Sequence, residues 1–131
     1  MTLPPLIAVI DDDRSVQTAL VGLLESNGWR ARGFDSAEDF LRITATQIYA
    51  CVITDIQMPG INGIALKRHF TTHNIETPVI MITAHAELGL RESAIASGAF
   101  FFLQKPFKAD ELIDCVEDAL NVSMQLYRAP P

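Results

Sequence analysis

The sequence lacks any cluster of lysine and arginine residues along its 131 positions. It carries 16 acidic against 10 basic residues, with a formal net charge of −6 at pH 7. Surfaces that bind nucleic acid or anionic membranes are usually basic, so this balance argues against both partners. Long apolar runs are also missing, because none approaches the roughly 20 residues that span a bilayer. The first five residues show no secretory signal. We expect a soluble, cytoplasmic protein.

Cysteine is scarce, and the two that occur show no metal-ligand spacing. Cys51 and Cys115 both lie inside apolar segments, where free cysteine usually behaves as a small buried hydrophobe. The hydrophobic content of 49% is enough for a sizeable core. The length fits a single domain, 1–131. We place its core at about 6–122 and treat 123–131 as a tail or the start of a linker.

Short apolar runs alternate with amphipathic stretches five times along the chain. The run at 6–10 is too short for a helix and lies between Pro5 and three aspartates, so it predicts a strand. The same criteria predict further strands at 29–34, 51–54, 78–82 and 100–103, and helices at 13–27, 36–43, 63–73, 87–97 and 109–126. This alternation implies a parallel sheet with helices on both faces. The polar run at 29–34 is expected near a sheet edge.

Candidate site residues follow the first, third, fourth and fifth predicted strands. In an open parallel α/β sheet the ligand site lies beyond the carboxyl ends of the strands. The residues in these places are Asp11, Asp12 and Asp13 after the first strand, Asp55 after the third, Thr83 after the fourth and Lys105 after the fifth. We therefore expect several carboxylates, a hydroxyl and an ammonium group to meet on one rim.

Such a group of side chains favours phosphoryl chemistry assisted by a metal ion. Clustered carboxylates repel one another unless a cation offsets their charge. Mg²⁺, or Mn²⁺, is suited to oxygen ligands. An ionised aspartate can then attack phosphorus, while the metal and Lys105 offset the charge on the transferring group. Thr83 could donate a hydrogen bond to a phosphoryl oxygen.

Four segments occur in a diagnostic order, each at the end of a predicted strand. They are IAVIDDD at 7–13, VITDIQMPGING at 52–63, VIMITAHA at 79–86 and SGAFFFLQKPF at 97–107. In these segments the sequence resembles the response-regulator receiver family of two-component signal transduction. The resemblance runs from about Ile7 to Leu120. It implies a doubly wound, flavodoxin-like (βα)5 fold, whose five parallel strands take the order 2-1-3-4-5.

The resemblance also implies a role for individual positions. Asp55 would be the phosphoacceptor, and Asp11 and Asp12 would hold Mg²⁺ together with Asp55 and the backbone carbonyl of Gln57. Lys105 would contact the phosphoryl group. The remaining implied roles are a switch hydroxyl for Thr83, a switch aromatic for Phe102, and modulation of dephosphorylation for Gln57 and His85. The Lys105–Pro106 bond is expected to be cis, since cis is cheap only before proline.

By the same resemblance, the phosphodonor would be a phosphohistidine on a sensor histidine kinase or a phosphotransfer protein. The domain would catalyse only single turnovers of its own phosphorylation and dephosphorylation, so it would be a switch and not an enzyme. The face made by the fourth helix, fifth strand and fifth helix would serve a partner or a homodimer. The segment GFDSAEDFL at 33–41 resembles receivers that precede a helix-turn-helix DNA-binding domain.

Several residues have a second interpretation. Asp13 is either a member of the acidic pair or an N-cap of the first helix, a position that suits aspartate. Phe102 is either a switch or a core residue, because three consecutive phenylalanines on a strand must face both sides. His69 and His73, four residues apart, have a spacing that permits metal binding, but no adjacent Glu or Cys completes a site.

Two rival functions fit the same fold class less well. A cofactor-binding flavodoxin-like protein would need a phosphate loop after the first strand, where this chain has acids that would repel a phosphate. A phosphatase with an aspartyl nucleophile usually spaces two aspartates two residues apart, as Asp11 and Asp13 are. That reading supplies no cap and leaves Asp55, Thr83 and Lys105 unexplained. A degenerate receiver is disfavoured because every key position keeps its residue.

Overall fold

The computed structural model describes residues 3–44, 49–85, 87 and 89–127. Strands and helices alternate throughout these ranges, as the hydrophobic pattern predicts. The elements are β1 (Leu6–Ile10), α1 (Arg14–Ser26), β2 (Arg30–Phe34), α2 (Ala37–Thr44), β3 (Cys51–Asp55), α3 (Gly63–Thr72), β4 (Val79–Thr83), α4 (Leu90–Ala96), β5 (Phe101–Gln104) and α5 (Ala109–Tyr127). None of the helices described is long and apolar enough to cross a membrane.

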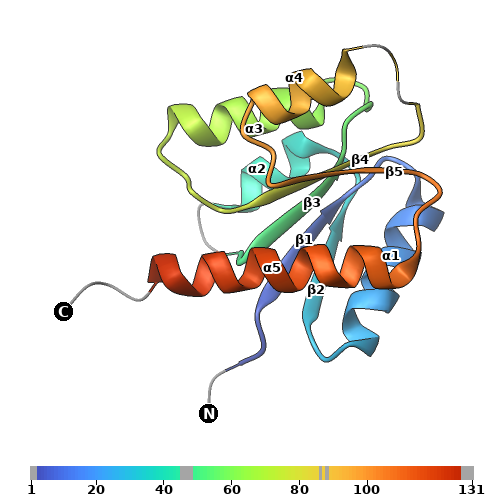
Figure 1. The fold of residues 1–131 in the computed structure, drawn as a ribbon, viewed down its shortest axis with the longest axis vertical. Helices are drawn as coiled ribbons and strands as arrows, with labels where there is room; N and C mark the ends of the chain where they lie inside the picture. The colour runs from blue at the N-terminus through green and yellow to red at the C-terminus, as the bar shows by residue number, and fades with distance from the viewer. Residues whose placement is uncertain (1–2, 45–48, 86, 88, 128–131) are drawn as a thin grey trace.

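All five strands are parallel and form one sheet in the order β2-β1-β3-β4-β5 (Figure 1). This confirms the predicted fold class and strand order. The three central strands are buried almost throughout, since apolar side chains cover both of their faces. The edge strand β2 is more polar and alternates between exposed and half-buried residues. Its place at the edge was also predicted.

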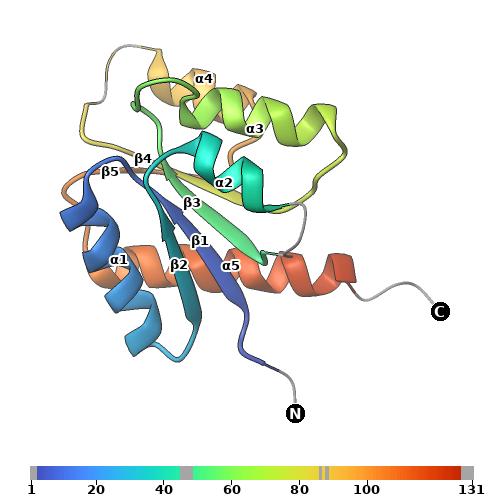
Figure 2. The same ribbon diagram turned by 180° about the vertical axis from the view of Figure 1, so that it is seen from behind.

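Helices cover the sheet on both sides, and each side has its own core. Helices α1 and α5 lie on one face, and α2, α3 and α4 lie on the other (Figures 1 and 2). Leu24, Ile53 and Val116 represent the core beneath α1 and α5. Phe40 and Phe70 represent the core on the opposite side. Because both faces are packed, the carboxyl edge of the sheet is where polar side chains can gather.

Element boundaries agree with the predicted ones to within a few residues, and the largest difference is at α4. This helix begins at Leu90, whereas the hydrophobic pattern predicted a start near residue 87. Gly89, the N-cap, has φ of 86°, a left-handed conformation that lies outside an α-helix, so the helix begins only after it. Asp55 and Thr83 are the last residues of β3 and β4, where the prediction had them directly after the strands. Helix α5 extends through Tyr127, and residues 128–131 lie outside the described residues.

Gly63, the first residue of α3, is packed too closely for any side chain. A Cβ atom there would lie 2.8 Å from the backbone oxygen of Asp55 and 3.2 Å from Cα of Ile56. We expect Gly63→Ala to lower the free energy of unfolding by about 1–3 kcal/mol, since neighbouring backbone would have to move. Urea denaturation measures this change.

Gly22 provides the matched control, because a Cβ atom there would meet nothing within 4 Å. It is an exposed residue in the middle of α1. Gly22→Ala should raise the free energy of unfolding by about 1 kcal/mol through helix propensity. Equal effects of the two substitutions would contradict the packing argument for Gly63.

Candidate functional site

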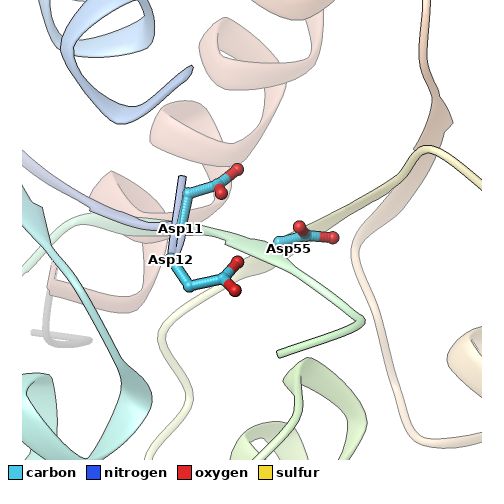
Figure 3. Close-up of side chains that lie close together, drawn as sticks. All are labelled: Asp11, Asp12 and Asp55. Carbon is cyan, nitrogen blue, oxygen red and sulfur yellow. The ribbon is translucent and has the colours of Figure 1, made fainter. Parts of the chain in front are cut away.

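Three carboxylates meet at the carboxyl edge of the sheet. Asp11 and Asp12 follow β1, and Asp55 ends β3. Because Ile10 is paired with Thr54 in the register of β1 and β3, Asp11 and Asp55 arrive at the same edge together. One oxygen from each of the three carboxylates lies within 4.8 Å of the others. Figure 3 shows Asp11 and Asp12 next to each other, with Asp55 beside them.

Lys105, which follows the edge strand β5, brings a positive charge to this cluster. Its Nζ atom lies 3.5 Å from Oδ2 of Asp11 and 4.0 Å from Oδ2 of Asp55. The backbone N–H of Lys105 donates to the carbonyl of Thr83, at 2.8 Å, which ties the end of β5 to β4. The bond between Lys105 and Pro106 is cis, as expected. The predicted convergence of acids and lysine is therefore present.

The charge balance around Asp55 is incomplete with Lys105 alone. Partial burial raises the pKa of the Asp55 carboxyl, and repulsion from Asp11 adds to this effect, while Lys105 opposes it. The side chain of Asp55 is only 14% exposed, so water does little to stabilise its charge. One ammonium group thus faces three acids. A hard divalent cation fits this donor set, which consists of carboxylate oxygens.

Asp13 is turned away from the cluster and caps α1. Its carboxylate accepts hydrogen bonds from the backbone N–H groups of Ser15, at 3.0 Å, and Val16, at 3.4 Å. Its hydrogen bond with the Ser15 hydroxyl is the main reason why the pKa of Asp13 lies below its usual value. The backbone N–H of Asp13 donates to Oδ1 of Asp11, at 2.9 Å. The structure thus groups Asp11 and Asp12 with Asp55, and uses Asp13 as the N-cap.

The loop after β3 is held by backbone interactions. The hydroxyl of Thr54, a fully buried residue, donates to the carbonyl of Asp55 at 2.9 Å. Gln57 is exposed, and its backbone N–H donates to Oδ1 of Asp55 at 3.4 Å. The N–H of Gly63 donates to the carbonyl of Ile56 at 3.1 Å. These contacts fix the path of the chain beside Asp55.

Thr83 is buried, and its hydroxyl is engaged within its own loop. It donates to the carbonyl of His85 at 3.0 Å and accepts from the N–H of His85 at 3.2 Å. Its residue is 0% exposed, whereas His85 is exposed. The hydroxyl would have to leave His85 in order to bond a group attached to Asp55.

Phe102 is half-buried on β5 and packs against the core beneath α2, α3 and α4. The guanidinium of Arg91 lies 5.7 Å from the centre of its ring. Phe100 packs against the opposite core, and Phe101 is 40% exposed. At least one of the three phenylalanines thus packs on the core and another, Phe101, is exposed, as predicted.

His69 and His73 lie on α3 and its C-cap. Their rings are 4.1 Å apart, and Nδ1 of His73 is 2.9 Å from the carbonyl of His69. In the described part of the chain, the acidic cluster alone brings three or more metal-ligating side chains together.

Gln17, a buried residue of α1, also contacts the acidic loop and is not among the predicted site residues. Its Nε2 atom lies 3.2 Å from the backbone carbonyl oxygen of Asp11. Gln17 precedes Leu20 and Leu24 by three and seven residues, so it shares their buried helix face. A glutamine at that place in an apolar stripe was the signal that could have identified it.

The fold and this edge define a doubly wound α/β domain whose acidic centre could hold a metal ion. The family model for the response regulator receiver domain matches residues 7–117. The chain therefore belongs to the response regulator receiver domain family of two-component systems.

Relatives with curated descriptions support this assignment. The chain is 36% identical to the transcriptional regulatory protein FixJ of Bradyrhizobium diazoefficiens, over 92% of this chain and 59% of that protein. It is 34% identical to the DNA-binding transcriptional regulator NtrC of Escherichia coli K12, over 88% of this chain and 25% of that protein. It thus spans between a quarter and three fifths of the length of these two relatives.

Solved structures show the same fold. The structure of FixJ-N superimposes with a TM-score of 0.84 at 30% identity, covering 92% of this chain and 96% of that one. A response regulator receiver protein from Burkholderia phymatum gives a TM-score of 0.80 at 41% identity, covering 89% and 95%. Both are similar over nearly their whole length.

The raised pKa of Asp55 predicts a pH-dependent stability without divalent cations. The folded state binds the Asp55 proton more tightly than the unfolded state, so this stabilisation is present at low pH and is lost as pH rises through the folded pKa. Asp55→Asn should therefore unfold at higher urea than the wild type at pH 7. The difference should shrink as the pH falls.

Asp114→Asn, at an exposed residue of α5, is the control, and it should shift the urea midpoint little at any pH. An Asp55→Asn effect that stayed constant across the pH range would contradict the explanation by ionisation of Asp55.

Proposed function

We propose that this domain is a phosphorylation-driven switch in which Asp55 accepts a phosphoryl group from a phosphohistidine. The observation that carries the proposal is the position of Asp55, whose carboxylate meets those of Asp11 and Asp12 within 4.8 Å and lies 4.0 Å from Nζ of Lys105. In the transfer, an Asp55 oxygen forms a bond to phosphorus as the phosphorus–nitrogen bond of the phosphoimidazole breaks. The imidazole leaves with the electron pair and takes up a proton. Attack by water on the phosphoryl group would later return Asp55 to a carboxylate.

Asp11, Asp12, Asp55 and the backbone carbonyl of Gln57 would hold Mg²⁺, or Mn²⁺, at this edge. When bound, the cation supplies charge stabilisation for the transferring group and permits Asp55 to be ionised. Lys105 interacts with Asp11 and Asp55 and would offset the remaining phosphoryl charge. Because Asp11 is 2% exposed, its charge depends on these two cations more than on water.

Thr83 and Phe102 would connect phosphorylation to the surface. The Thr83 hydroxyl would exchange its His85 partner for a phosphoryl oxygen, which would draw in the end of β4. Phe102 would then change its packing beneath Arg91. Such a switch shifts the populations of two existing states. Gln57 and His85, both exposed near the rim, would tune the access of water to the phosphoryl group.

The partners of this cycle would be a sensor histidine kinase or a phosphotransfer protein in the cytoplasm. The output would pass through the face of α4, β5 and α5, which exposes Ile95 and Phe101, to a homodimer or another domain. The relatives FixJ and NtrC are transcriptional regulators longer than this chain. We infer that residues 1–131 act as the receiver part of such a regulator and do not bind nucleic acid themselves.

The rival phosphatase function needs a second acid two residues after Asp11. The carboxylate of Asp13 caps α1, so it is committed elsewhere. A phosphate-bearing cofactor would meet the acidic cluster without a compensating loop. Both observations favour the switch.

Incubation with acetyl phosphate and Mg²⁺ should add one phosphoryl group to the protein. Intact-protein mass spectrometry measures the adduct, which should require Mg²⁺ and should be absent from Asp55→Asn. Asp114→Asn, on α5, should be phosphorylated like the wild type. An Mg²⁺-dependent adduct that persisted in Asp55→Asn would show that the acceptor is another residue.

Thr83→Ala should separate phosphorylation from its consequence. The variant should still accept a phosphoryl group, because Thr83 is not the nucleophile. Its loop after β4 should no longer gain protection from hydrogen exchange when phosphorylated, since the hydroxyl that would draw it in is absent. Thr83→Ser keeps the hydroxyl and should restore the protection. Full protection in Thr83→Ala would contradict the switch role.

A further inference from the structure

Gln17 reaches from α1 to the ends of β1 and β2. Its Nε2 atom lies 3.2 Å from the carbonyl of Asp11, 3.0 Å from the carbonyl of Phe34 and 3.0 Å from Oδ1 of Asp35. All three neighbours are acceptors, so the NH₂ end of the carboxamide must face them. The side chain is 9% exposed. Gln17 thus links the ends of β1 and β2 through hydrogen bonds from one side chain.

Gly33 in β2 leaves the space that this side chain uses. A Cβ atom at Gly33 would lie 2.1 Å from Oε1 of Gln17 and 2.7 Å from its Cγ. Gly33 does not have a positive φ, so its backbone alone does not demand glycine. Its missing side chain is therefore what lets the carboxamide lie across β2.

We propose that Gln17 is a positioning residue for the acidic pair, an inference that rests on the proposed metal-dependent function. By holding the Asp11 carbonyl, Gln17 fixes the peptide that joins Asp11 to Asp12. Two further hydrogen bonds hold the same turn: the N–H of Asp11 donates to Phe34 at 3.1 Å, and the N–H of Asp13 donates to the Asp11 carboxylate at 2.9 Å. The Gln17 side chain thus joins α1 to this turn, beside the N-cap that Asp13 forms.

Asp35 supports the carboxamide from outside. It accepts from Gln17 and from Arg14, whose Nη2 atom is 2.6 Å from Oδ2. These three residues line a cleft of about 430 Å³ that opens between α1, β2 and α2. The ion pair between Arg14 and Asp35 is exposed and contributes little stability. We therefore expect the hydrogen bond from Gln17 to Asp35 to matter mainly for the orientation of the carboxamide. Because the cleft is open, a water molecule could take over the hydrogen bonds of the amide in a Gln17→Ala variant. A substitution that keeps the size of the side chain leaves no room for that water and is the stricter test.

The test is Gln17→Met, which keeps the volume and loses the donor. The probe is Mn²⁺ alone, with its free concentration measured by electron paramagnetic resonance, and each variant's stability is measured by urea denaturation. Gln17→Met should bind Mn²⁺ at least about tenfold more weakly than the wild type, the usual size of an effect on groups that orient metal ligands. Leu20→Ala, on the same helix and buried in the core beneath α1 and α5, should lose stability and keep its Mn²⁺ affinity.

Gly33→Ala perturbs Gln17 without replacing it. The new methyl group should displace the carboxamide and weaken Mn²⁺ binding, and the same substitution should have no such effect when Gln17 is already Ala. Wild-type affinity in Gln17→Met, or an equal loss in Leu20→Ala, would overturn the positioning role. A wild type that does not bind Mn²⁺ would instead show that the metal site itself is wrong, and the inference would fall with it.

Discussion

Mutual repulsion of three carboxylates is the constraint on which this domain depends. One oxygen from each of Asp11, Asp12 and Asp55 lies within 4.8 Å of the others, and among the described residues Lys105 alone forms ion pairs with this cluster, to Asp11 and Asp55. Burial and repulsion together raise the pKa of Asp55. Lys105 offsets part of this repulsion, and the two apolar layers on either side of the sheet stabilise the fold against it.

Repulsion between these carboxylates also gives a reason for the many hydrogen bonds and close contacts that hold the backbone at this edge. The N-cap by Asp13, the Thr54 hydroxyl on the carbonyl of Asp55 and the close packing of Gly63 each fix one loop. Gln17 does the same for the turn after β1. Thr83 differs, because its hydroxyl bonds a neighbouring loop residue that could be exchanged for another partner. At this rim the described contacts hold the loops after β1 and β3, and the Thr83 hydroxyl bonds His85 in the loop after β4.

Much of this arrangement follows from the sequence, because parallel strands bring their carboxyl ends to one edge. From the sequence alone, that rule predicts Asp11, Asp12, Asp55, Thr83 and Lys105 at the same edge of the sheet. Gln17 was missed although its place in an apolar helix stripe was a signal, because two of its three partners are backbone carbonyls, which residue types alone do not reveal. The late start of α4 depends on the left-handed φ of Gly89, which glycine permits but does not require. The hydrogen bonds of Thr83 depend on a loop conformation that residue types alone do not determine.

The most direct test of the central claim is to locate the phosphoryl group on the chain. Borohydride reduces an acyl phosphate on aspartate to the alcohol, which leaves homoserine at the modified position. Peptide mapping by tandem mass spectrometry after treatment with acetyl phosphate and Mg²⁺ then reads that position. The account predicts homoserine at residue 55 and at no other aspartate. Homoserine at residue 11 or 12, or phosphate on a histidine, serine or threonine instead, would contradict it.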